Sequence, residues 1–162
     1  MNLFHWGKKK EEKPELDIEQ LKGTDGKVYE DAVSVRLAVF VDEQGIDKEL
    51  ELDGHDEDAT HYVGYDHGTP VVTARVKALD DDLLQIQRVA TIDWARHRGY
   101  AVALINQITA DAKENGFKTL YLEAQETAIS FYAKQSFEAY GQPFLEANIW
   151  HRKMTKELYP EE

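Results

Sequence analysis

Residues 85–101, QIQRVATIDWARHRGYA, decide most of what the sequence predicts about the fold. Apolar and polar residues alternate from residue 84 to residue 87, which is typical of a β-strand with one buried face. At Arg88 the alternation slips by one position and resumes on Val89. Either a β-bulge or a merely imperfect alternation explains this slip. A bulge would splay the strand and expose backbone groups, as it often does beside active sites.

A short loop follows this strand and leads into a helix that is predicted over residues 99–115, with Gly116 as its stop signal. The N–H groups at a helix start have no partner inside the helix, and the helix dipole adds positive potential. Arg96 and Arg98 bring two cations to the same place, and Gly99 allows the backbone to approach a ligand closely. The loop is therefore either a phosphate site or an ordinary helix cap.

The remaining patterns extend outward from this strand, loop and helix. Further strands are predicted over residues 15–21, 60–65, 70–78, 118–124, 137–140 and 149–155, and further helices over residues 29–41 and 127–135. The strands at 60–65 and 70–78 form a predicted hairpin, and Gly141 and Pro143 are expected to join the last two strands. Strand, helix, strand, helix favours parallel pairing. We therefore expect an α/β (α+β) protein with a mixed central sheet and helices on both faces.

Length and charge limit the class of protein. With 162 residues the chain has the size of one domain, which we expect over residues 15–162 after a flexible N-terminal tail, residues 1–14. Thirty-one acidic against 19 basic residues give a net charge of −12, which repels phosphate backbones. We expect no nucleic-acid partner and, without any apolar run near ~18 residues, no stable membrane association.

Cysteine is absent, which excludes disulfides, thiolate metal sites and cysteine nucleophiles. The six histidines show no metal-binding spacing with a carboxylate, so we expect no metal. The N-terminus lacks the apolar core of a secretory signal, and we expect a cytoplasmic protein. Neither a Gly-x-x-x-x-Gly-Lys nor a Gly-x-Gly-x-x-Gly motif occurs, which disfavours nucleotide hydrolysis and dinucleotide binding.

Acidic residues crowd one stretch of the chain, residues 42–58. It holds Asp42, Glu43, Asp47, Glu49, Glu51, Asp53, Asp56, Glu57 and Asp58, with only Lys48 opposing them. Such a run is either a solvated loop or a surface that attracts a cationic substrate.

Two segments resemble those of GNAT acetyltransferases, in the family's order. Arg96-x-x-Gly99-x-Ala101 after a strand resembles the pyrophosphate loop for acetyl-CoA, and residues 130–137, SFYAKQSF, are similar to the family's Phe-Tyr-x-x-x-Gly-Phe segment. Ser136 stands where the family usually has glycine, which puts the local turn in question. VFVDEQ at 39–44, LD at 52–53 followed by His61, AQ at 124–125 and FLEANIWH at 144–151 resemble the ElaA/YjcF-like branch.

The resemblance implies a seven-stranded sheet that splays between its fourth and fifth strands, with acetyl-CoA in the gap. The pantetheine arm would pair with backbone near Val89 and Thr91. The residues implied to bind acetyl-CoA are Val89, Ala90, Thr91, Arg96, His97, Arg98, Gly99, Tyr100, Ala101, Phe131 and Tyr132.

The resemblance further implies that Tyr132 is the general acid that protonates the departing thiolate; the alternative is a core aromatic. Glu43, Glu146 and His151 are candidates for the general base, although each also has an ordinary structural interpretation. The expected reaction is direct attack of an amine on the thioester, by a monomer or homodimer. Two alternatives are a CoA-binding sensor without catalysis and a structural interaction domain. The sequence does not identify the amine, which is a small molecule or a peptide.

Overall fold

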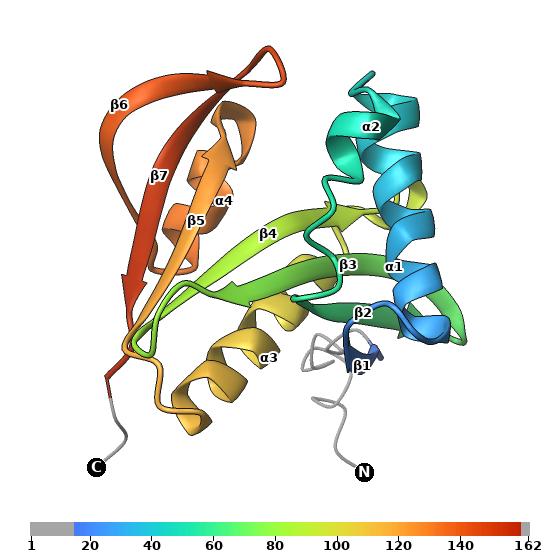
Figure 1. The fold of residues 1–162 in the computed structure, drawn as a ribbon, viewed down its shortest axis with the longest axis horizontal. Coiled ribbons are helices and arrows are strands. Elements are labelled where there is room, and N and C mark those ends of the chain that lie inside the picture. Colours follow the sequence, from blue (N-terminus) through green and yellow to red (C-terminus); the bar gives the residue numbers. More distant parts are fainter. Residues whose placement is uncertain (1–14, 160–162) are drawn as a thin grey trace, which may run out of the picture.

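The computed structural model describes residues 15–159, which contain one seven-stranded sheet with helices on both faces (Figure 1). The strand order is β1-β2-β3-β4-β5-β7-β6. Neighbouring strands are antiparallel except β4 and β5, which are parallel. The mixed sheet predicted from the sequence is confirmed, whereas the predicted tail, residues 1–14, lies outside the described residues.

The elements follow the predicted order. The strands are β1 (Asp17–Lys22), β2 (Thr60–Asp66), β3 (Thr69–Ala78), β4 (Leu83–Thr91), β5 (Thr119–Gln125), β6 (Glu138–Glu146) and β7 (Ile149–Glu157). The helices are α1 (Lys27–Arg36), α2 (Lys48–Glu51), α3 (Tyr100–Glu114) and α4 (Ile129–Lys134), with the π-helical η2 (Leu37–Glu43) and the 3₁₀ turns η3 (Asp93–Ala95) and η4 (Glu126–Ala128).

Each face of the sheet is covered by helices that bury apolar side chains. Ala32 of α1 packs with Val63 and Tyr65 of β2 on one face. Leu104 and Ile108 of α3, both fully buried, belong to the main core on the other face. A fully buried aliphatic side chain contributes about 1.5–3 kcal/mol, so the α3 face is the main source of stability.

The sheet splays between its two parallel strands. β4 and β5 pair only from Leu83 with Thr119 to Ile86 with Leu122, and beyond this point they separate. Figure 1 shows β5, β6 and β7 turning away from β4. The register of β3 and β4 shifts opposite residues 88–89, and Arg88 has a φ of +57°. The slip of the sequence pattern at Arg88 is therefore a β-bulge.

The helix predicted over residues 29–41 differs from the structure in its second half. After Arg36 the chain continues as a π-helix, in which Gln44 donates its N–H to the carbonyl of Val39, five residues earlier, over 3.1 Å. The apolar pattern of this stretch does not distinguish an α-turn from a π-turn. Isolated π-turns often occur at functional sites.

The predicted position of the turn between the last two strands was wrong. Gly141 and Pro143 lie inside β6, at an irregularity between Tyr140 and Phe144, and the reversal occurs at Ala147 and Asn148 with φ of +50° and +61°. β6 is an edge strand, so a proline without an N–H removes no hydrogen bond that a central strand would need.

Among residues 15–159, no helix has both the length and the apolar character needed to cross a membrane.

Candidate active site

A cavity of about 260 Å³ lies where β4 and β5 separate. Gln87 and Val89 line it from β4, and Glu123 and Gln125 line it from β5. The two strands no longer pair at this level, so side chains of both strands line the cavity between them. This is the gap in which the sequence resemblance places acetyl-CoA.

The part of β4 beyond the bulge has backbone groups that face this gap. Ile92 donates its N–H to β3 over 2.8 Å. Because backbone groups alternate in direction along an antiparallel strand, Thr91 and Val89 face away from β3. Consistently, the Thr91 carbonyl accepts a hydrogen bond from Arg96 Nε over 3.1 Å. Ala90, between them, is buried.

The start of α3 has no side-chain cap, and Gly99 precedes it with a left-handed φ of +82°. The first helical hydrogen bond joins Ala103 N to Gly99 O over 3.0 Å, so the N–H groups of residues 100–102 have no partner within the helix. The Tyr100 hydroxyl donates to Asp66 over 2.8 Å and anchors this first turn. A helix start of this kind is suited to an anion.

Two of the predicted site residues form an ion pair with each other. Arg96 Nη2 lies 2.7 Å from Glu43 Oε1, and each side chain is about one third exposed, at 33% and 35%. Arg98 lies over the Trp94 ring, 5.8 Å from its centroid. Glu43 does not line the cavity, so the structure places it beside the predicted phosphate loop rather than beside an acceptor.

The other predicted contacts of acetyl-CoA are partly buried or exposed. His97 is exposed, with a left-handed φ of +64°. Ala101 and Phe131 are partly buried and pack against the main core.

The end of α4 fixes the position of Tyr132. Ser136 donates its N–H to Ala133 O over 3.1 Å, and Phe137 donates its N–H to Tyr132 O over 3.1 Å. These two bonds form a Schellman motif, which requires a left-handed residue at the position of Ser136. Ser136 adopts it with a φ of +71°. The Phe137 ring then packs edge-on against Tyr132, with 5.7 Å between the centroids.

Tyr132 lines the cavity, although only 7% of the residue is exposed. Burial raises the pKa of its phenol above the usual 10. The phenol therefore keeps its proton at neutral pH and has it available to donate. Its ring also packs in the main core, as the alternative interpretation expected, while its role as general acid stays a prediction.

His151 and Glu146 line the same cavity from the β6–β7 hairpin. His151 lies opposite Gln125 of β5 and stacks on Phe144 of β6 at 5.7 Å between ring centroids. Its Nδ1 lies 2.7 Å from the carbonyl of Ile149. A carbonyl can only accept, so Nδ1 carries the proton and the neutral ring has its lone pair on Nε2.

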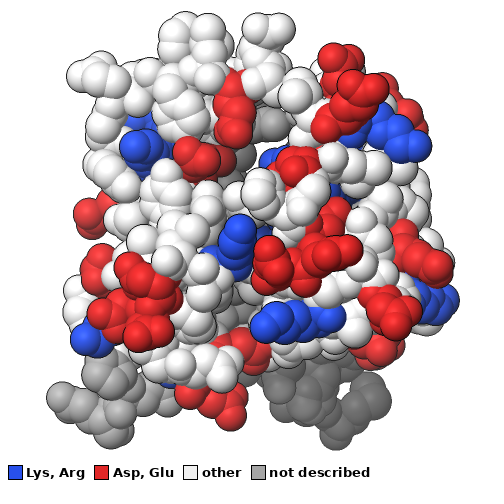
Figure 2. All heavy atoms as spheres, viewed as in Figure 1, with Lys and Arg blue, Asp and Glu red and all other residues white. Residues whose placement is uncertain are grey.

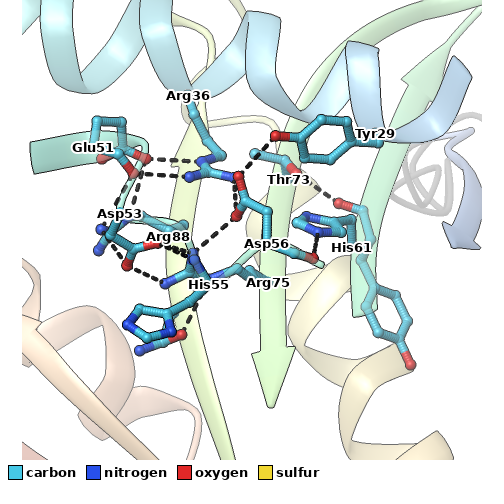
Figure 3. A network of polar contacts seen from close by, with 12 residues as sticks. Tyr29, Arg36, Glu51, Asp53, His55, Asp56, His61, Thr73, Arg75 and Arg88 are labelled. Atoms are coloured by element: carbon cyan, nitrogen blue, oxygen red, sulfur yellow. Dashed lines mark hydrogen bonds and ion pairs between the residues drawn. The ribbon is translucent and has the colours of Figure 1, made fainter. Parts of the chain in front are cut away.

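The acidic stretch is neither a solvated loop nor a free acidic surface at three of its positions. Glu51 pairs with Arg36 and Arg88, Asp53 pairs with Arg75 and Arg88, and Asp56 pairs with Arg36 and Arg75, as Figure 3 shows. On the face in Figure 2, acidic side chains are interspersed with basic ones and form no single patch. At these three positions the negative charge is therefore compensated by arginines, and attraction of a cation by the rest of the stretch stays a prediction.

Sequence reasoning missed this network because its arginines come from three elements, α1, β3 and β4. Arg36 and Arg75 are each 1% exposed. Burial tends to raise the pKa of Asp56, but the hydrogen bond from Arg75 and the charge of Arg36 outweigh it, and the pKa is lowered. For Glu51 burial dominates, and its pKa is raised. The signal that could have indicated this network is the presence of arginines inside the apolar patterns of the predicted helix and strands, at Arg36, Arg75 and Arg88.

A family model described as "Acetyltransferase (GNAT) family" matches residues 27–137. The chain belongs to the GNAT family of acetyltransferases. The uncharacterized N-acetyltransferase YjcF of Bacillus subtilis is 30% identical over 128 residues, which cover 78% of this chain and 91% of YjcF. The resemblance found from the sequence motifs is confirmed, and acetyl-CoA is the acyl donor of the family.

Solved structures agree with this assignment in their fold. ElaA of Escherichia coli matches with a TM-score of 0.77 at 24% identity, over 88% of this chain and 99% of ElaA. A GNAT family acetyltransferase of Elizabethkingia anophelis, crystallised with acetyl-CoA, matches with a TM-score of 0.65 at 17% identity, over 88% of this chain and 98% of that one.

Proposed function

We propose that this GNAT protein transfers the acetyl group of acetyl-CoA to an amine that enters the cavity between β4 and β5. The observation that carries the proposal is that one cavity is lined by Val89 and Tyr132 and also by Glu146 and His151. The donor would extend from the uncapped start of α3 along the backbone of β4, where Val89 and Thr91 face away from β3. The acetyl group and the amine then meet within one enclosure.

The charge of the cavity favours a protonated amine as the acceptor. Glu123 and Glu146 line it, and Arg88 is the single lysine or arginine in the lining. Arg88 is paired with Glu51 and Asp53, so its charge is compensated. The net negative charge raises the local concentration of a cation, and this effect weakens as salt is added.

A protonated amine must lose a proton before it attacks the thioester, and we assign this step to His151. The lone pair on His151 Nε2 can accept that proton directly or through a water molecule. The amine nitrogen then bonds to the acetyl carbon while the carbon–sulfur bond breaks. Tyr132 donates its proton to the sulfur, so CoA leaves as a thiol. The nitrogen loses its second proton as the amide forms, and this proton returns through water to the phenolate of Tyr132. No cysteine is available for a covalent acyl-enzyme, which favours direct attack.

The test is a screen by mass spectrometry of amines, polyamines, aminoglycosides and peptide N-termini with acetyl-CoA and purified protein. The expected result is an acetylated amine that forms in proportion to enzyme. Its rate should fall with His151→Gln while acetyl-CoA affinity, measured by calorimetry, stays the same. A protein that binds acetyl-CoA but acetylates none of these amines would favour the sensor instead.

A further inference from the structure

The bulge residue Arg88 has a conformation that is costly for any residue except glycine. Its φ is +57°, whereas the left-handed region is sterically unfavourable for a side chain with a Cβ. Glycine would form the same bulge without strain. An arginine at this position indicates that its side chain has a task, because such strain is retained where surrounding contacts compensate it.

The side chain of Arg88 reaches across the cavity wall to the segment at residues 50–53. Its Nη2 donates to the carbonyls of Leu50 and Glu51 over 3.3 and 3.4 Å and to Asp53 Oδ2 over 3.2 Å. Its Nε lies 3.0 Å from Glu51 Oε2, within ion-pair distance but without hydrogen-bond alignment. Figure 3 shows Arg88 beside Glu51 and Asp53.

Two other arginines hold the same segment, and one of them, Arg75, also reaches β4, where its Nε donates to Gln87 Oε1 over 3.1 Å. Of these three arginines, Arg88 is the one that belongs to β4 itself, at the bulge, and lines the cavity. Arg36 binds Glu51 from α1, and Arg75 binds Asp53 from β3; both are buried and neither lines the cavity. Arg88 does line it, and its side chain is 23% exposed. Its individual bonds are longer than the usual 2.9 Å, so this connection is the one that can be adjusted.

Leu50 and Glu51 line the cavity, on the side opposite to α4. Leu50 is also 57% exposed, so an acceptor can reach it from the solvent. The wall that an acceptor would touch is therefore tied to the bulge that carries the backbone groups for the donor.

From these contacts we propose that Arg88 is a positioning residue that couples donor binding at the β4 bulge to the placement of residues 47–53, the acceptor wall. This inference rests on the proposed function, because it assigns the donor to β4 and the acceptor to the cavity. A donor that pairs with the β4 backbone would restrain the bulge, and through Arg88 it would order the wall before the amine enters.

Amide hydrogen exchange with coenzyme A as the probe tests this coupling. The amides of Leu50, Glu51 and Leu52 donate to backbone carbonyls over 2.9–3.1 Å, so opening of the wall is measurable. In the wild type, coenzyme A should slow exchange at residues 87–91 and also at 47–53. In Arg88→Gly the bulge keeps its preferred conformation, so coenzyme A should still bind and still slow exchange at 87–91.

At residues 47–53 the variant should behave differently. Arg88→Gly removes several hydrogen bonds to charged or carbonyl groups, so exchange there should become about tenfold faster, and coenzyme A should no longer slow it. The matched control is His67→Gly, which relieves another left-handed residue, φ +49°, in the β2–β3 turn without touching the wall. It should leave exchange at 47–53 unchanged.

Wild-type slowing at 47–53 in Arg88→Gly would overturn the proposal and leave the positioning to Arg36 and Arg75. If Arg88→Gly exchanges rapidly throughout and is unfolded, Arg88→Lys replaces it. That variant keeps the charge but loses the fork, so a smaller loss of the same kind is expected, and no loss would contradict the proposal. A wild type that fails to bind coenzyme A would instead refute the proposed function. The exchange rates without coenzyme A would still test whether Arg88 holds residues 47–53 in place.

Discussion

Tyr132→Phe separates the proton donor from the aromatic ring that holds it. The ring contacts Phe131 and Phe137 at 5.1 and 5.7 Å between centroids, and phenylalanine preserves both. Within residues 15–159 burial alone, and no hydrogen bond, raises the pKa of this phenol, so the free energy of unfolding should change by less than about 0.5 kcal/mol. Any loss of activity then reports on chemistry and not on folding.

The expected loss in kcat is about 10²- to 10⁴-fold, the usual contribution of a general acid, which corresponds to ~2.7–5.4 kcal/mol in the barrier. Burial raises the pKa of Tyr132, so the acid stays protonated to higher pH than an ordinary phenol. Deprotonation of Tyr132 should therefore cause no fall in the wild-type kcat below pH 10. The assay measures thiol release against pH, with acetyl-CoA affinity by calorimetry. Equal kcat in both proteins when chemistry limits turnover would refute this role for Tyr132.

Three further predictions concern the neighbouring elements. Glu43→Gln removes one of the two carboxylates paired with Arg96, the other being Asp93. It should tighten acetyl-CoA binding about two- to fivefold, the size of an exposed ion pair, with kcat retained; a large fall in kcat would make Glu43 the base. Ser136→Gly relieves a left-handed serine and should raise Tm by about 1–4 °C, while Gly116→Ser, at the equivalent position after α3, should lower it; equal effects of both would contradict this. Burial lowers the pKa of His61, so as the pH falls the unfolded chain takes up a proton at this residue before the folded chain does. The free energy of unfolding should therefore fall below pH 6.5, by up to about 1.4 kcal/mol per pH unit. Urea titrations of the wild type and His61→Gln at pH 7.5 and 5.5 check this, and the same pH dependence in both proteins would exclude His61 as the cause.

Local patterns predicted the donor side of the site. The slip at Arg88 indicated either a bulge or an imperfect alternation, and the structure has the bulge. The arginine and glycine positions before α3 indicated either a phosphate site or an ordinary cap, and the structure has a helix start without a side-chain cap. These features depend on residues that are close in sequence, where periodicity and glycine placement carry the information. Ser136 was noted as a departure from the family pattern, and the structure places it in the left-handed conformation that glycine favours.

The pairing of charges could not be predicted in the same way. Arg36, Arg75 and Arg88 find their carboxylates only after α1, β3 and β4 have packed together, because 15 to 37 residues separate the partners along the chain. The same holds for Glu43 and Arg96, which are 53 residues apart. A charge run therefore appears solvated from its composition, although part of it is a buried ion-pair network.

We propose that acetyl transfer takes place in the cavity between β4 and β5. The most direct measurement follows the label from ¹³C-acetyl-CoA into an amine by mass spectrometry, for the wild type, Tyr132→Phe and Gly99→Val. We expect a labelled amine with the wild type and slow labelling with Tyr132→Phe. Gly99→Val should weaken acetyl-CoA binding, because its side chain would stand at the uncapped start of α3. Undiminished labelling and binding in both variants would contradict it.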